Sequence, residues 1–160
     1  MNLMLKKNLM IIMITKFDKY KQIQFVEEFG HKYEVILQKC ENSFHDDAQN
    51  EVDWYINELM NLYINGGEVY RIVSLKNKKK IDDNNLGNHW TSDEGMFDRI
   101  YGNILPENPK LKPYVITAYV KPKSVNVEGS LSAFEELPEE GEIYIDSNVA
   151  QFVSVKKYKM

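Results

Sequence analysis

Apolar residues in the first part of the chain recur every three or four positions, which is the spacing of one helix face. Between residues 17 and 39 this pattern comprises Tyr20, Ile23, Val26, Phe29, Tyr33, Ile36 and Leu37. Gly30 interrupts it, so the pattern predicts either one bent helix or two. A second helical pattern runs from Val52 to Tyr63, and Gly66 and Gly67 follow it, as is typical of a helix C-cap. Residues 1–66 are therefore predicted to form a helical region.

The hydrophobic pattern changes from helical to alternating after Gly67. Val69, Arg71, Val73 and Leu75 are expected on one face of a β-strand. Further strands are predicted at residues 114–120, 140–146 and 152–155, and short helical segments at residues 96–101 and 132–136. The sequence thus predicts one α+β domain. Residues 1–66 form its helical N-terminal region, and residues 67–160 form a mostly β core.

Charge and cysteine content limit the kinds of partner and compartment. The formal net charge is −4, which does not favour binding to nucleic acid. Residues 76–85, which include Lys78-Lys79-Lys80, form a polar loop that is expected to be solvated, although such a run can contact a polyanion. The single cysteine, Cys40, excludes an internal disulfide, fits a reducing compartment and is expected to be a buried core thiol.

The first residues carry a short apolar run at positions 9–14, after Lys6 and Lys7. The run is too short to span a bilayer, and no small-residue cleavage site follows it. We therefore expect a cytoplasmic protein that does not insert into membranes. The sequence does not indicate an oligomeric state, and no metal-binding spacing is present.

Three stretches contain residues suited to binding or chemistry. Arg71 stands in an apolar row, where a guanidinium needs an anionic partner such as a phosphate or carboxylate. Thr91 and Ser92 follow a glycine turn, and either hydroxyl could cap a following helix. Glu140 and Glu142 flank Gly141 at the start of a predicted strand and are expected to project to the same side. Such a pair is either a solvated turn or part of a site that stabilises positive charge.

In chain order these stretches are Tyr70-Arg71 on a strand, Trp90-Thr91-Ser92 after a glycine turn, and Glu140-Gly141-Glu142 entering a strand. This series resembles the ADP-ribosyltransferase superfamily, in the branch with an arginine, an aromatic residue followed by Ser or Thr, and Glu-x-Glu. The resemblance covers residues 68–155. Residues 114–123 also look like the strand that precedes Glu-x-Glu in small bacterial and phage-borne members. The middle motif reads Trp-Thr-Ser instead of Ser-Thr-Ser, so either Thr91 or Ser92 supplies the working hydroxyl.

The resemblance implies a split core of two packed sheets with NAD bound between them as substrate and no metal. It implies that Glu142 stabilises the cation formed when nicotinamide leaves, and that a hydroxyl of Thr91 or Ser92 orients Glu142. Arg71 and Tyr70 would bind NAD, with Trp90 forming part of the nicotinamide pocket and Ser92 contributing there.

The resemblance also concerns the acceptor, which would be a macromolecule, most simply an arginine of a protein. Glu140 would engage this acceptor, and the segment of residues 129–139 would read the target through an exposed Phe134. Hydrolysis of NAD without an acceptor would use the same residues. The alternative from a different class is a non-enzymatic phage or mobile-element protein that uses the same scaffold for interaction or inhibition.

Overall fold

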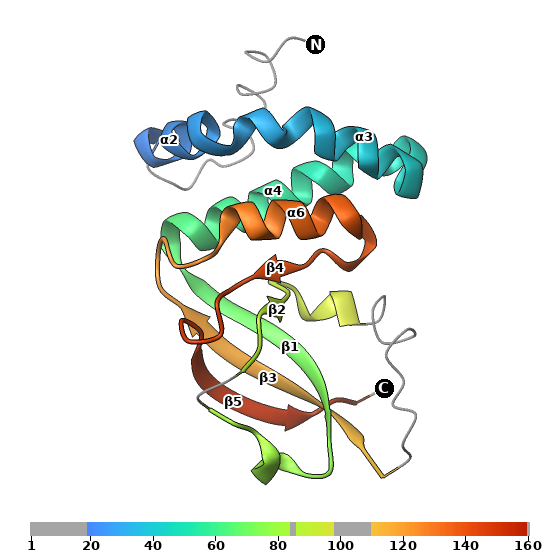
Figure 1. Cartoon of the computed structure of the whole chain (residues 1–160), viewed down its shortest axis with the longest axis vertical. Coiled ribbons are helices and arrows are strands. Elements are labelled where there is room, and N and C mark those ends of the chain that lie inside the picture. The colour runs from blue at the N-terminus through green and yellow to red at the C-terminus, as the bar shows by residue number, and fades with distance from the viewer. Residues whose placement is uncertain (1–18, 84–85, 98–109, 160) are drawn as a thin grey trace.

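The computed structural model describes residues 19–83, 86–97 and 110–159. The architecture is α+β, as the sequence predicts, with a helical region and two antiparallel sheets of three and two strands. Figure 1 shows the helices at one end of the molecule, the three-stranded sheet at the other, and the two-stranded sheet between them. The apolar run at positions 9–14 lies outside the described residues.

The helical region begins with α2 (Lys19–Phe29) and α3 (Tyr33–Phe44), separated by the 3-10 turn η1 (Gly30–Lys32). The interruption at Gly30 therefore divides two helices. A second 3-10 turn, η2 (His45–Asp47), leads into α4 (Ala48–Asn65), which contributes eight buried residues to the core. The predicted C-cap is confirmed, because α4 ends at Gly66 with a φ of 69°. A Cβ atom at Gly66 would lie 2.4 Å from the carbonyl oxygen of Val120, so only glycine fits there.

The larger sheet contains β1 (Gly67–Leu75), β3 (Lys112–Val120) and β5 (Gln151–Lys157) in the order β1-β3-β5. The smaller sheet pairs β2 (His89–Trp90) with β4 (Ile143–Tyr144). One bridge joins the two sheets, because Tyr70 and Thr91 exchange backbone hydrogen bonds of 2.8 and 2.9 Å. The strand that carries Arg71 is thus held beside the strand that carries His89.

Short elements complete the chain. These are η3 (Lys78–Lys80), η4 (Glu94–Met96), α6 (Val127–Glu136) and η5 (Pro138–Glu140). Part of the helix predicted at residues 96–101 lies outside the described residues. The helical turn predicted near residue 132 is a longer helix, α6, and it packs against α3, α4 and β4. Among the described residues, no helix combines the length and apolar character needed to cross a membrane.

One core joins the helices to the sheets, with buried side chains from α2, α3, α4, α6, β1, β3 and both strands of the smaller sheet. Cys40 is fully buried there, as the sequence predicts, and burial raises the pKa of its thiol to about 12. The ring of Phe134 stacks on that of Tyr55, with centroids 3.9 Å apart, and Phe134 is only 1% exposed. The prediction of an exposed Phe134 that contacts a target is therefore wrong.

Candidate functional site

A cleft of about 290 Å³ lies where the two sheets meet. Its lining comprises Tyr70, Arg71, Ile72, His89, Trp90, Thr91, Phe97, Glu140 and Glu142. Six of the seven site residues expected from the sequence are in this set, although they come from three distant stretches of the chain. Ser92 is the exception, because it does not line the cleft.

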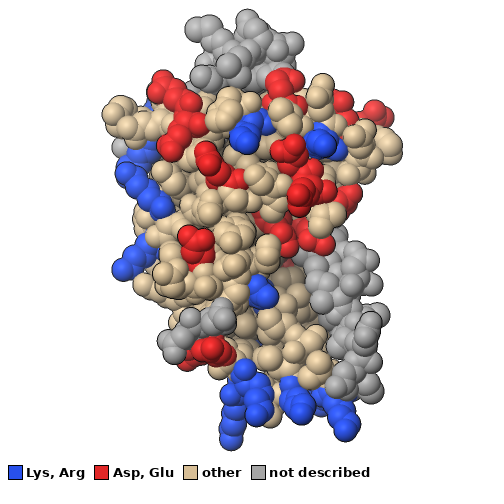
Figure 2. Space-filling model, in the orientation of Figure 1, with Lys and Arg blue, Asp and Glu red and all other residues tan. Residues whose placement is uncertain are grey.

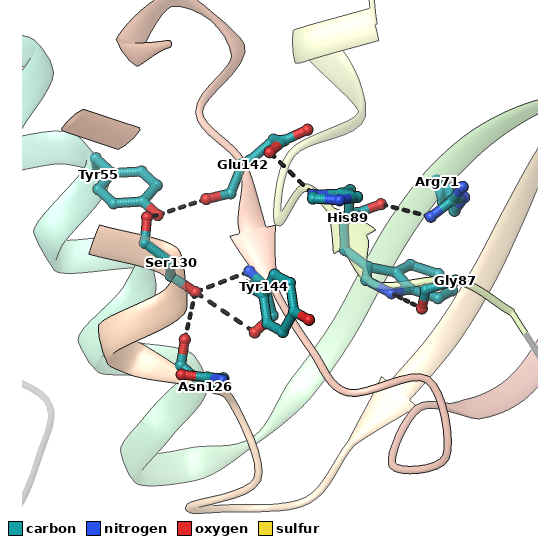
Figure 3. Close-up of polar contacts among 9 residues, drawn as sticks. Tyr55, Arg71, Gly87, His89, Asn126, Ser130, Glu142 and Tyr144 are labelled. Carbon is teal, nitrogen blue, oxygen red and sulfur yellow. Dashed lines mark hydrogen bonds and ion pairs between the residues drawn. The ribbon is translucent and has the colours of Figure 1, made fainter. Parts of the chain in front are cut away.

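Arg71 projects from β1 and is partly buried. Its guanidinium packs directly on Gly87, where a Cβ atom would lie only 2.2 Å from Nη1. Nη1 donates a hydrogen bond of 3.4 Å to the carbonyl oxygen of His89 (Figure 3). Burial lowers the pKa of Arg71, and the negative charge of Glu142 opposes that shift. Glu142 therefore stabilises the Arg71 cation, and the guanidinium keeps donors available for an anionic ligand.

Glu142 is held by His89 across the smaller sheet. The β2–β4 register pairs His89 with Tyr144 and Trp90 with Ile143, and Glu142 directly precedes β4. Nδ1 of His89 lies 3.0 Å from Oε2 of Glu142. A carboxylate only accepts hydrogen bonds, so this contact requires a proton on Nδ1. The edge of the imidazole ring also meets Tyr144, with ring centroids 5.7 Å apart.

The backbone around Glu142 is fixed from the helical side. The hydroxyl of Tyr55, on α4, lies within hydrogen-bond distance of the carbonyl oxygens of Glu142 and Ser130, the latter at 2.8 Å (Figure 3). Oγ of Ser130, on α6, accepts a 2.8 Å hydrogen bond from the backbone N–H of Tyr144 and donates to the carbonyl of Asn126. Two buried hydroxyl groups therefore determine where β4 presents the Glu142 side chain.

Glu140 reaches the cleft from a turn and not from a strand. The predicted strand at residues 140–146 is wrong over its first half, because Pro138–Glu140 is a 3-10 turn and Gly141 has a left-handed φ of 54°. Burial raises the pKa of Glu140, and the neighbouring Glu142 carboxylate raises it further through its charge and a hydrogen bond. Glu140 therefore holds a proton more tightly than an exposed glutamate does, which suits it to a role in proton transfer.

The middle motif has its hydroxyl turned into its own loop. Thr91 is buried, and its Oγ1 lies 3.2 Å from both the N–H and the carbonyl oxygen of Asp93. Within the described residues, His89 and not Thr91 contacts the Glu142 side chain. The predicted helix cap at Thr91 or Ser92 is wrong, since Asp93 caps η4 by accepting a 2.8 Å hydrogen bond from the N–H of Gly95.

Trp90 is buried beside the cleft, and its indole N–H donates to the carbonyl of Gly87 at 3.1 Å. This bond holds the glycine on which Arg71 rests. Tyr70 also lines the cleft and contacts Oε2 of Glu68 through its hydroxyl at 3.3 Å.

Three residues that position Glu142 or its strand lie outside the three motifs: Tyr55, His89 and Ser130. His89 directly precedes the middle motif, and alternation along an extended strand places it on the same side as Thr91. That alternation is a signal present in the sequence. Tyr55 and Ser130 carry no such signal, because their contacts with the Glu142 and Tyr144 backbone join residues 87 and 14 positions apart.

Comparisons with known proteins leave the site to be interpreted from its geometry. No protein-family model, no curated protein and no solved structure matches the chain. Among the residues that the structure describes, no group of three or more His, Cys, Asp or Glu side chains could hold a metal ion. The chemistry proposed below is built on Arg71, His89, Glu140 and Glu142, which are held close together by the contacts described above.

Proposed function

We propose that the protein is an NAD-dependent mono-ADP-ribosyltransferase that releases nicotinamide and transfers ADP-ribose to a macromolecule. The observation that carries this proposal is the convergence of Arg71, Glu140 and Glu142 on one cleft. A partly buried guanidinium beside two carboxylates can bind a phosphate and stabilise a cation at the same site. NAD requires both, since its pyrophosphate is anionic and the departure of nicotinamide leaves a ribosyl cation.

The position of Arg71 suits contact with the central pyrophosphate of NAD. A second hollow of about 330 Å³ also has Arg71 in its lining, together with Lys80, Ile81, Leu86 and Gly87. Arg71 is thus shared by two neighbouring hollows. We place the pyrophosphate at its guanidinium, the nicotinamide riboside beside Trp90 and Glu142, and the adenosine in the second hollow.

The reaction begins with cleavage of the bond between ribose C1′ and the nicotinamide nitrogen. The bonding electron pair leaves with nicotinamide, which becomes neutral, and positive charge develops over C1′ and the ring oxygen. The Glu142 carboxylate, oriented by the Nδ1–H of His89, stabilises this charge as it forms. An acceptor nitrogen then bonds to C1′ and loses a proton to the Glu140 carboxylate.

The arrangement of the sheets supports an ADP-ribosyltransferase-like split core. Two antiparallel sheets meet at the cleft and are joined by the Tyr70–Thr91 bridge. The acceptor is proposed to be a protein arginine, because Glu140 lies beside Glu142 in the same cleft and its ionised carboxylate would attract and deprotonate a guanidinium. A cytoplasmic location would supply both NAD and such acceptors.

Paired substitutions of the two carboxylates test the proposal. Glu142→Gln keeps the shape but removes the charge, so nicotinamide release and acceptor labelling should both fall by about 10²-fold or more. Glu140→Gln should preserve nicotinamide release in the absence of acceptor and reduce labelling of an arginine-rich protein. The two assays use labelled NAD and the full chain.

Two outcomes would contradict this assignment. If wild-type protein neither releases nicotinamide nor binds NAD, the enzymatic proposal fails and the non-enzymatic interaction protein becomes the better description. If Glu140→Gln reduces both assays equally, the separate roles of the two carboxylates are wrong. Thr91→Ala and Ser92→Ala, measured beside them, show whether either hydroxyl contributes.

A further inference from the structure

The fold separates positive from negative charge along the molecule. Antiparallel pairing brings the C-terminal end of β1, the N-terminal end of β3 and the C-terminal end of β5 together, since Leu75 pairs with Lys112 and Lys157 with Tyr114. The 3-10 turn η3 follows β1 at this end of the larger sheet. Seven exposed lysines gather here, and we call them the basic tip: Lys76, Lys78, Lys79, Lys80, Lys112, Lys157 and Lys159.

Acidic residues concentrate at the opposite end. Figure 2 shows most Asp and Glu side chains over the helical half, where some Lys side chains also lie, and a group of Lys side chains at the far end of the sheet. Asp82 and Asp83 follow η3 closely, and Glu94 forms an ion pair of 3.5 Å with Lys156, next to Lys157. Within the described residues, none of the seven ammonium groups of the basic tip forms an ion pair. The net charge of −4 is therefore an average over two ends of opposite sign.

We infer that the basic tip binds the phosphodiester backbone of a nucleic acid duplex without reading its sequence. The inference does not depend on the proposed enzymatic activity. Neighbouring strands lie about 4.8 Å apart, so lysines on three strands and the adjoining turn can approach several closely spaced phosphates together. Lysine suits this task because its ammonium is a flexible point charge, whereas specific contacts to bases favour side chains that bond to base edges.

The surroundings of the basic tip favour a duplex over other polyanions. Among the described residues, the exposed large apolar side chains lie on the helices, after α6 or at the opposite ends of β3 and β5: Tyr20, Ile23, Val35, Tyr119, Leu137, Phe152 and Val153. Basic surfaces that bind membranes usually add apolar side chains that enter the lipid, and surfaces that bind single strands add aromatic rings that stack on bases. Neither kind of exposed side chain accompanies the basic tip within the described part of the chain, which favours contacts to a regular phosphate backbone.

The formal net charge of −4 weighs against binding to nucleic acid only as long as the positions of the charges are ignored. Because salt screens charges over short distances, the positions of the charged residues matter more than their sum. At about 0.1 M salt the Debye length is about 10 Å, so acidic residues at the far end of the molecule scarcely reduce the potential at the basic tip. A duplex would meet the local charge and not the average.

The test is the salt dependence of duplex binding by the full chain. Fluorescence anisotropy of short labelled DNA and RNA duplexes is measured between about 50 and about 200 mM salt. The triple variant Lys78→Glu, Lys79→Glu, Lys80→Glu should bind at least about tenfold more weakly at the lower salt. The slope of log K against log salt should decrease in magnitude by about 3, one for each lysine. The DNA and RNA arms show which duplex is preferred.

A matched control separates the basic tip from net charge. The control is the triple variant of exposed lysines in the helical region, Lys19→Glu, Lys21→Glu, Lys39→Glu, which alters the net charge by the same amount. Its effect on duplex affinity should stay below about threefold. Equal losses in both triple variants would overturn the inference, as would binding that does not depend on salt. Binding to vesicles containing phosphatidylserine, with no binding to either duplex, would also overturn it.

Two further variants keep the test decisive. If the η3 triple variant fails to fold by circular dichroism, Lys112→Glu with Lys157→Glu removes charge from β3 and β5 instead and should give the same direction of change. Glu142→Gln should bind duplex as wild type does, even though its nicotinamide release is expected to fall. Failure of the enzymatic proposal and failure of the duplex inference are thus distinguishable.

Discussion

Replacing Gly87 with alanine tests whether the guanidinium of Arg71 must occupy its observed position. The new Cβ atom would lie 2.2 Å from Nη1 and 2.5 Å from Cζ of Arg71, whereas carbon–nitrogen contacts need about 3.4 Å. The guanidinium must therefore move by roughly 1 Å. Gly87 also has a φ of 91°, which costs an alanine about 1–2 kcal/mol of folding stability.

The displaced guanidinium should bind the NAD pyrophosphate less well. A hydrogen bond to a charged group contributes about 1.5–3 kcal/mol, and each 1.4 kcal/mol is a tenfold change in affinity. Gly87→Ala is therefore expected to weaken NAD binding by about 10- to 100-fold while the protein remains folded. The measurement is isothermal titration with NAD, together with urea denaturation to record the loss of stability.

Two controls make this prediction specific. Gly95→Ala places a Cβ atom 3.2 Å from Oδ1 of Asp93, without the positive φ, and should leave NAD affinity within about twofold. In an Arg71→Ala background the further loss caused by Gly87→Ala should disappear, because the two changes act through the same group. A folded Gly87→Ala protein with wild-type affinity, or equal losses in both backgrounds, would refute the reasoning.

Three other changes give separate tests. His89→Ala should slow nicotinamide release by about tenfold or more because Glu142 loses its orienting donor, whereas His89→Asn should retain much of the rate. Equal rates in the two variants would show that the hydrogen bond is unimportant. The raised pKa of Glu140 means that the folded state holds its proton more tightly than the unfolded chain. The free energy of unfolding should therefore fall as pH rises from the usual glutamate range to that raised pKa, and Glu140→Gln should lose this dependence in denaturation curves at several pH values. Phe134→Ala should lower the free energy of unfolding, measured by urea denaturation, by about 3–5 kcal/mol because it removes one ring of a buried stack, whereas Leu137→Ala at the exposed neighbour should change it by at most about 0.5 kcal/mol. Similar small losses at both positions would contradict the buried position of Phe134.

The periodicity of apolar residues correctly predicts the helices and strands that bury one continuous face. α4, β1 and β3 follow their patterns closely, and Gly66 ends α4 where the sequence predicts. The same periodicity predicts the secondary structure around Glu140 only in part. The alternation of residues 140–146 favours a strand, but Pro138 and the left-handed Gly141 form a turn first, so β4 is only Ile143–Tyr144.

The candidate site was predicted in part for a similar reason. The order of the motifs along the chain predicts that Arg71, Glu140 and Glu142 belong to one site, and all three line the cleft. The hydroxyl of Thr91 illustrates what spacing cannot supply. Its nearest partners, the backbone groups of Asp93, are two residues away and satisfy it locally, which leaves the Glu142 side chain to His89. Whether a hydroxyl turns inward or bonds its own loop depends on geometry within a few ångströms.

The buried hydroxyl of Tyr55 has a consequence for how the molecule unfolds. This one group belongs to α4 but contacts the backbone of Glu142 and of Ser130, so the helical region and the segment that carries Glu142 share a polar contact inside a common core. Breaking it would leave buried carbonyl oxygens without a donor, which is costly. Hydrogen exchange should therefore show amides of α4 and of β4 opening together as one cooperative unit, and a chain that begins at Gly67 should fail to position Glu142 even with every cleft residue present.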